Sequence, residues 1–129
     1  MMTQHRGLSA LTLSTTRMAE TVAFYEALGF RLDFGGPDAP FTTLWAGPTA
    51  LNLTTEAHGT HGFWGRAIFH VANVDAFHAM VLEAGYSPHA PPRDADWGER
   101  FFHITDPDGH ELSFATPLGD AAEPGSSEV

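Results

Sequence analysis

Two short segments of the chain alternate between side chains of two kinds, the period of a β-strand. In residues 10–14, Leu11 and Leu13 share one face. In residues 66–71 the side chains also divide between two faces, one with Ala67, Phe69 and Val71 and the other with Arg66, Ile68 and His70. Each segment predicts a strand that packs one face against a helix and leaves the other face uncovered by that helix.

A helix is expected after each of these strands. Residues from about Met18 to Leu28 and from Val74 to Ala84 carry apolar side chains at helical spacing. Thr16 and Asn73 are of the residue types that cap helix N-termini. A glycine follows each helix, where a left-handed backbone commonly ends it.

Three further strands are expected after each helix. They are Arg31 to Phe34, Thr42 to Ala46 and Thr49 to Thr54 in the first half, and Ser87 to Ala90, Arg100 to Thr105 and Glu111 to Ala115 in the second. Turn residues separate the last two strands of each half, at Gly47-Pro48 and at residues 106–109.

The two halves are an internal repeat. A shift of 56 residues places residues 10–30 on residues 66–86, with Gly29 on Gly85. The pattern predicts one α+β domain over residues 1–117, built of two βαβββ repeats at about 7–56 and 63–117. Residues 118–129 are expected to be a disordered acidic tail.

Composition narrows the class of protein. The 129 residues include no cysteine, which excludes disulfides and thiolate metal sites and suits a reducing compartment. The formal net charge of -10 argues against a nucleic-acid partner, although the acidity itself is explained by solubility alone. The polar start and the lack of a long apolar run predict a cytoplasmic protein with no membrane segment.

Three segments resemble those of a known family. Residues 23–30 read AFYEALGF, residues 69–75 read FHVANVD and residues 106–109 read DPDG. In this order they resemble the vicinal oxygen chelate superfamily, which includes glyoxalases, bleomycin-resistance proteins and extradiol dioxygenases. Residues 97–102, WGERFF, look most like the bleomycin-resistance branch. The resemblance implies a cupped mixed sheet with helices outside, and a homodimer.

The resemblance also implies where metal ligands would stand. In metal-dependent relatives they come from the first and last strand of each half, and the matching positions here are Ala10, Asn52, Arg66 and Ser113. These offer no donor, a neutral amide, a cation and a hydroxyl, whereas divalent metals favour imidazole and carboxylate ligands. We therefore expect no metal and no other cofactor.

An unorthodox site remains open at this point. His70 and Glu111 are both expected on the cavity face and could begin a metal site, which Arg66 beside them would oppose. Arg66 has two interpretations: an internal ion pair with Glu111, or a fork that receives an anionic group of the ligand. His58, His61, His103 and His110 are expected to be loop or structural residues.

Aromatic side chains complete the candidate binding site, although each could equally belong to a packed core. Trp45, Trp64 and Trp97 stand near predicted strand ends and offer flat faces to a planar ligand. The candidate ligand-binding residues are Arg66, His70, Glu111, Ser113, Asn52, Trp45, Trp64 and Trp97.

Two functions follow from these features. The first is a metal-free protein that binds a small organic molecule, as in antibiotic resistance by drug or toxin sequestration. The second is a glyoxalase-like lyase or dioxygenase-like enzyme with an altered site, in which His70 or Glu111 acts as a general base. A ligand-sensing protein without chemistry is a third possibility.

Overall fold

The computed structural model describes residues 4–56 and 62–119. The chain divides into two compact units, Met1–Thr60 and His61–Val129, and each unit contains one βαβββ repeat. His58, His61 and most of the expected acidic tail lie outside the described residues. No helix in the described part of the chain is long and apolar enough to cross a membrane.

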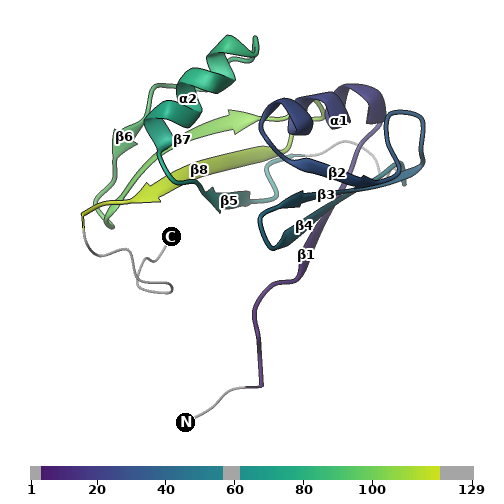
Figure 1. Cartoon of the computed structure of the whole chain (residues 1–129), viewed down its shortest axis with the longest axis horizontal. Helices are drawn as coiled ribbons and strands as arrows, with labels where there is room; N and C mark the ends of the chain where they lie inside the picture. The colour runs from purple at the N-terminus through teal and green to yellow at the C-terminus, as the bar shows by residue number, and fades with distance from the viewer. Residues whose placement is uncertain (1–3, 57–61, 120–129) are drawn as a thin grey trace. The chain divides into compact units, whose positions relative to one another are not determined.

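The first unit is one four-stranded mixed sheet with one helix (Figure 1). Its elements are β1 (Ala10–Ser14), α1 (Met18–Ala27), β2 (Arg31–Phe34), β3 (Phe41–Ala46) and β4 (Thr49–Thr54). The strand order is β1-β4-β3-β2, with β1 parallel to β4 and the other pairs antiparallel. The helix lies over one face of this sheet.

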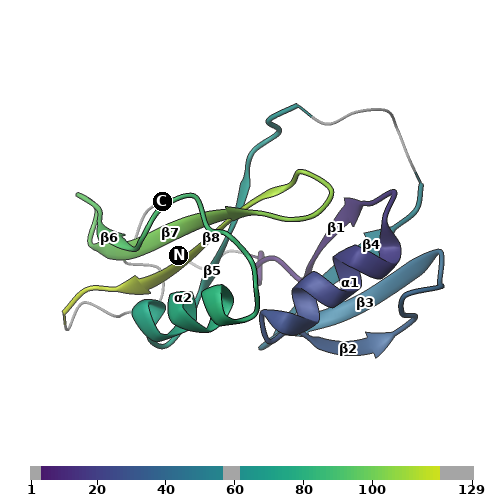
Figure 2. The ribbon, with the colours of Figure 1, turned by 90° about the horizontal axis from the view of Figure 1, so that it is seen from above.

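The second unit repeats this arrangement. Its elements are β5 (Arg66–His70), α2 (Val74–Glu83), β6 (Arg93–Asp94), β7 (Glu99–Thr105) and β8 (Glu111–Pro117). The strand order is β5-β8-β7-β6, with β5 parallel to β8, and α2 lies over one face of the sheet (Figure 2). The predicted α+β fold with two βαβββ repeats is confirmed.

The 56-residue repeat holds for both the first strand and the helix of each unit. Displaced by that number, Ala10–Ser14 becomes Arg66–His70 and Met18–Ala27 becomes Val74–Glu83, as observed. The glycines that end the two helices have nearly equal positive φ angles, 94° at Gly29 and 96° at Gly85. Both therefore take the left-handed conformation that a side chain would disfavour.

One of the two expected helix caps is correct. The Asn73 side chain accepts a hydrogen bond from the backbone N–H of Ala76. The expectation for Thr16 was wrong, because the N-cap of α1 is Arg17 and it makes no side-chain capping bond. Instead the hydroxyl of Thr15 accepts a bond of 3.0 Å from the backbone N–H of Arg17.

The predicted strand at Ser87 to Ala90 was also wrong. The edge strand β6 is the dipeptide Arg93–Asp94, which pairs with Phe101 and Arg100 of β7. Prolines at 88, 91 and 92 lack the N–H that a strand ladder requires, so this segment forms no continuous ladder with β7, although the His89 N–H donates to the carbonyl of His103 at 2.9 Å. The Arg100 side chain then secures the edge by donating to Asp94 at 3.1 Å.

An aromatic core joins α2 to one face of the second sheet. Phe77 of the helix lies 4.6 Å from Phe114 and 6.2 Å from Phe102, measured between ring centroids. Phe102 and Phe114 are almost fully buried. Because side chains alternate along a strand, their neighbours at 101, 103 and 113 point to the opposite face, which α2 does not cover.

Candidate ligand-binding site

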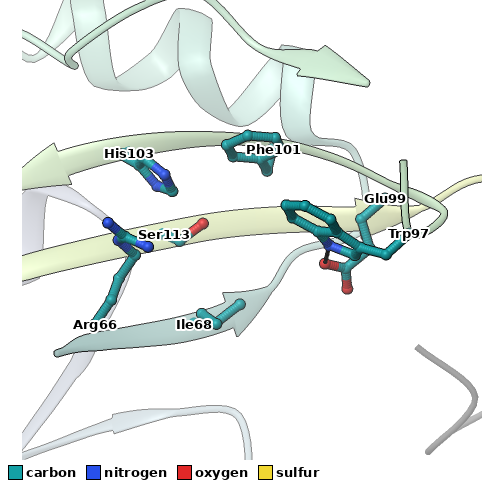
Figure 3. A pocket seen from close by; sticks show the side chains of 7 residues that line it. All are labelled: Arg66, Ile68, Trp97, Glu99, Phe101, His103 and Ser113. Atoms are coloured by element: carbon teal, nitrogen blue, oxygen red, sulfur yellow. Dashed lines mark hydrogen bonds between the residues drawn. The ribbon is translucent and has the colours of Figure 1, made fainter. Parts of the chain in front are cut away.

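A pocket of about 210 Å³ lies on the face of the second sheet that α2 leaves uncovered (Figure 3). Strands β5, β7 and β8 and the turn before β7 supply its lining. The lining residues are Arg66, Ile68, Trp97, Glu99, Phe101, His103 and Ser113. All of them belong to one unit, so the pocket is defined by the second repeat alone.

The strand register explains how these side chains meet. Ser113 of β8 is the register partner of Ile68 on β5 and of His103 on β7. Register partners on neighbouring strands project to the same face and lie within contact distance. The three side chains therefore form a row across the middle of the sheet, with His103 and Ser113 converging as Figure 3 shows.

Two stacked aromatic rings form one wall of the pocket. The ring centroids of Trp97 and Phe101 are 5.8 Å apart, and their planes differ by 29°. Trp97 is 46% exposed and Ile68 is 39% exposed, so apolar surface is open to a ligand. Such a surface can bury a flat apolar molecule.

Arg66 closes one end of the pocket by an ion pair. Its Nε donates a hydrogen bond of 2.6 Å to Glu111 Oε1, and a guanidinium Nη2 contacts the same oxygen. The predicted internal ion pair is thus confirmed. Because the carboxylate is largely covered, it needs this partner, while both side chains keep some exposure.

Glu99 stands at the opposite end of the pocket, and the sequence did not point to it. Its carboxylate is 1% exposed, accepts 3.1 Å from the indole N–H of Trp97, and contacts His70 Nε2. The idea that His70 joins Glu111 was wrong, because they stand at different ends of the β5–β8 pair: Arg66 is the register partner of Glu111, and His70 that of Ala115. Glu99 belongs to the segment WGERFF, residues 97–102, and this segment was the signal in the sequence that could have indicated it.

His103 was expected to be structural, but it lines the pocket. Burial lowers the pKa of its imidazole, and the nearby Arg66 lowers that pKa further. The ring is therefore neutral at pH 7. Its alternation with Phe101 along β7 was the signal that could have placed it on the pocket face.

The remaining candidates of the second unit lie beside the pocket. Trp64 donates its indole N–H to Nδ1 of the buried His110 at 2.8 Å, which supports the structural role expected for that histidine. A second hollow of about 230 Å³ is lined by Trp64, Glu111 and neighbouring residues of the two loops. Trp64 and Glu111 are thus close to the first pocket without lining it.

Asn52 and Trp45 belong to the first unit. The Asn52 amide accepts 2.7 Å from the hydroxyl of Thr43 and donates 3.2 Å to that of Thr12. Trp45 donates to Asp33 at 3.0 Å. These side chains form a row across the first sheet that is the counterpart, in the other repeat, of the pocket row Ile68, Ser113 and His103. In the first unit the row is held by the two hydrogen bonds of Asn52, to Thr12 and to Thr43.

Comparisons with known proteins match this fold. Residues 7–114 match the model of the Glyoxalase/Bleomycin resistance protein/Dioxygenase superfamily. An uncharacterized protein of Mycolicibacterium smegmatis is 34% identical over 110 residues, which cover 84% of this chain and 91% of that protein. The chain therefore belongs to the glyoxalase, bleomycin-resistance and dioxygenase superfamily.

Solved structures support the same architecture. A Bacillus anthracis protein assigned to the glyoxalase family has a TM-score of 0.77 at 17% identity, over 91% of this chain and 99% of its own. TioX from Micromonospora sp. ML1 has a TM-score of 0.72 at 24% identity, over 87% of this chain and 99% of its own. Identities this low bear on the fold alone.

The metal that many family members use does not fit the residues present here. Ala10 has no donor atom, Asn52 is held by two threonines, Arg66 is a cation bound to Glu111, and Ser113 offers a neutral hydroxyl. Elsewhere in residues 4–56 and 62–119, no three His, Asp or Glu side chains cluster closely enough to hold a metal ion. We therefore assign no role to a metal.

Proposed function

We propose that this protein binds a small, flat organic molecule without a metal, in the manner of a drug- or toxin-sequestering bleomycin-resistance protein. The observation that carries the proposal is the pocket of Figure 3, in which a stacked Trp97–Phe101 wall faces Ile68. A cation occupies the family's third metal position, so the pocket is better suited to recognition than to metal chemistry.

The pocket has polar groups at its two ends and apolar surface between them. Arg66 and His103 stand at one end, Glu99 at the other, and Ile68 and Phe101 in the middle. Ligand sites commonly combine apolar walls with a few placed polar groups that set orientation. The volume of about 210 Å³ favours a compact ligand of one or two rings.

We further propose that the protein works as a homodimer in the cytoplasm. Edge strands β1, β2, β5 and β6 present unpaired backbone groups unless another element covers them. Large apolar side chains such as Phe34 and Phe63 are 63% and 72% exposed. A second copy of the chain would cover such surface and could complete a groove around a longer ligand.

One observation favours the alternative, an enzyme of the lyase or dioxygenase type. His70 is 49% exposed, and its Nε2 contacts the buried carboxylate of Glu99 at the edge of the pocket. A carboxylate that orients an imidazole is a common general-base arrangement. Incubation of each ligand found with the protein, followed by NMR for new resonances, separates a catalyst from a binder.

The direct test is binding of planar aromatic compounds to two matched tryptophan variants. Trp97 and Trp64 are both 46% exposed and both donate an indole hydrogen bond, but only Trp97 lines the pocket. In a saturation-transfer NMR screen, compounds that bind the wild type should lose at least about tenfold affinity in Trp97→Leu and little in Trp64→Leu. No binder, or equal binding by Trp97→Leu, would overturn the proposal.

A further inference from the structure

One polar atom in the pocket has an unmet hydrogen bond. Among the side chains that the structure describes, His103 Nδ1 is the one buried nitrogen or oxygen without a hydrogen-bond partner. An atom left unsatisfied in this way has lost its hydrogen bond to water without gaining another, which costs free energy. A ligand group that pairs with Nδ1, after a small movement of the ring toward the pocket, would recover part of that free energy.

The charges around His103 are mainly positive. Arg66 on β5, Arg93 on β6 and His89 in the loop before β6 all disfavour its protonation, and Glu111 on β8 acts in the opposite direction. Arg66 and Glu111 neutralise each other in their ion pair. The positive charge of Arg93 is not part of this ion pair.

Arg93 lies on the pocket face of the sheet. It is the register partner of Phe101, and its guanidinium carbon lies 4.6 Å from the centroid of the Phe101 ring. Within residues 4–56 and 62–119, no carboxylate forms an ion pair with it. The Arg93 guanidinium covers the ring of Phe101 and has no ion-pair partner in this part of the chain. It therefore adds positive potential to the end of the pocket at which His103 stands.

We propose that the ligand of this pocket is an aromatic carboxylate, with its ring against Trp97 and its anionic oxygen bound to His103 Nδ1. This inference rests on the proposed function and names the ligand class. Arg93 favours the negative charge, and His103 donates the hydrogen bond. Glu99, whose charge would repel an anion, lies at the opposite end of the pocket, where it is bound by His70 and Trp97.

A bound anion would also reverse the proton preference of His103. In the free protein burial and the arginines keep the imidazole neutral, whereas a carboxylate at Nδ1 would favour the imidazolium. Binding should then take up a proton. Each unit by which binding raises the pKa of His103 strengthens affinity up to tenfold at low pH. For a rise of about one unit, affinity should increase by up to about tenfold between pH 8 and pH 5.5.

The experiment compares two probes of the same shape, 2-naphthoate and the uncharged 2-naphthamide, by calorimetry with the full chain. 2-Naphthoate should bind at least about tenfold more tightly and with proton uptake, seen as a difference between buffers of unequal ionisation enthalpy. His103→Gln should remove both the pH dependence and the proton uptake. Arg93→Gln should weaken 2-naphthoate about fivefold and leave 2-naphthamide unchanged.

A histidine variant on the other face of the sheet serves as the matched control. His78 contacts Phe102 on the face opposite to the pocket. His78→Gln should retain the proton uptake. Melting curves of all variants verify that each is folded.

The outcomes separate this inference from the proposed function. Equal binding of the two probes would reject an anionic ligand while a Trp97-dependent site stands. Preference for 2-naphthoate with unchanged pH dependence in His103→Gln would reject the role of His103. If neither probe binds, the aromatic carboxylate is rejected, and the tryptophan screen alone decides the proposed function.

Discussion

Arg66 and Glu111 are register partners on the parallel strands β5 and β8, and they are joined by a hydrogen-bonded ion pair of 2.6 Å. The resemblance to metal-dependent relatives implies a ligand position at Arg66, where this chain has a cation. The positive charge of Arg66 is neutralised by Glu111 on the neighbouring strand, so the two side chains together carry no net charge at this end of the pocket. Removing either partner should therefore have a distinct consequence.

Arg66→Ala should destabilise the fold and weaken ligand binding. It leaves the Glu111 carboxylate partly buried without its partner, at a cost of about 1 kcal/mol because both side chains keep some solvent contact. Thermal unfolding measures this change. If Arg66 also contacts an anionic ligand, affinity should fall about ten- to a hundredfold, from the loss of a charged hydrogen bond.

Glu111→Gln and the double variant separate these two effects. The double variant should recover part of the stability that Arg66→Ala loses, since no unpaired carboxylate remains. Ligand affinity should stay low in the double variant if Arg66 binds the ligand. Recovered stability with wild-type affinity would reject the binding role of Arg66.

Much of the fold could be predicted because its signals are local. Alternation along residues 66–71, the helical spacing that follows, and the glycines at 29 and 85 are read directly from neighbouring residues. The failures were where local signals compete. Prolines interrupt the segment before β6, which is Arg93–Asp94, and the N-cap of α1 is Arg17 rather than Thr16.

The site was harder to predict because it depends on register between distant strands. The pairing of Arg66 with Glu111 followed from the resemblance and from charge complementarity. The contact of His70 with Glu99 joins residues 29 apart, and no periodicity within one segment could reveal it. Alternation with Phe101 could have placed His103 on the pocket face, but its neighbours there depend on the pairing of β7 with β8, which sets His103 beside Ser113.

Protein purified without added metal should contain far less than one divalent metal ion per chain. The four ligand positions that the resemblance implies hold Ala10, Asn52, Arg66 and Ser113, which lack imidazole and carboxylate donors. Elemental analysis after gel filtration makes the measurement, with a zinc titration followed by calorimetry as a control. About one tightly held metal per chain would contradict the proposed metal-free function.

The protein should sediment as a homodimer at micromolar concentration. The expectation rests on the four edge strands and on exposed apolar side chains such as Phe63, at 72% exposure. Analytical ultracentrifugation over a dilution series measures the mass directly. A monomer across the micromolar range would argue against a binding groove between two subunits.

The stability of the ligand-free protein should fall as the pH drops below about 6.5, and His103 should account for part of that fall. The folded state lowers the pKa of His103, chiefly by burial, so below the ordinary value of 6.5 the unfolded chain binds a proton that the folded chain refuses. The contribution of the neutral ring is therefore fully present above pH 6.5 and is lost as the pH falls toward the folded pKa.

His103→Gln removes this linkage between stability and pH. Its melting temperature should decline less steeply than that of the wild type between pH 7 and pH 5, by a few degrees at most. His78→Gln, on the opposite face of the sheet, should preserve the wild-type slope that scanning calorimetry records. Parallel slopes for the wild type and His103→Gln would show that His103 titrates as it does in the unfolded chain, and the neutral imidazole in the pocket would have to be abandoned.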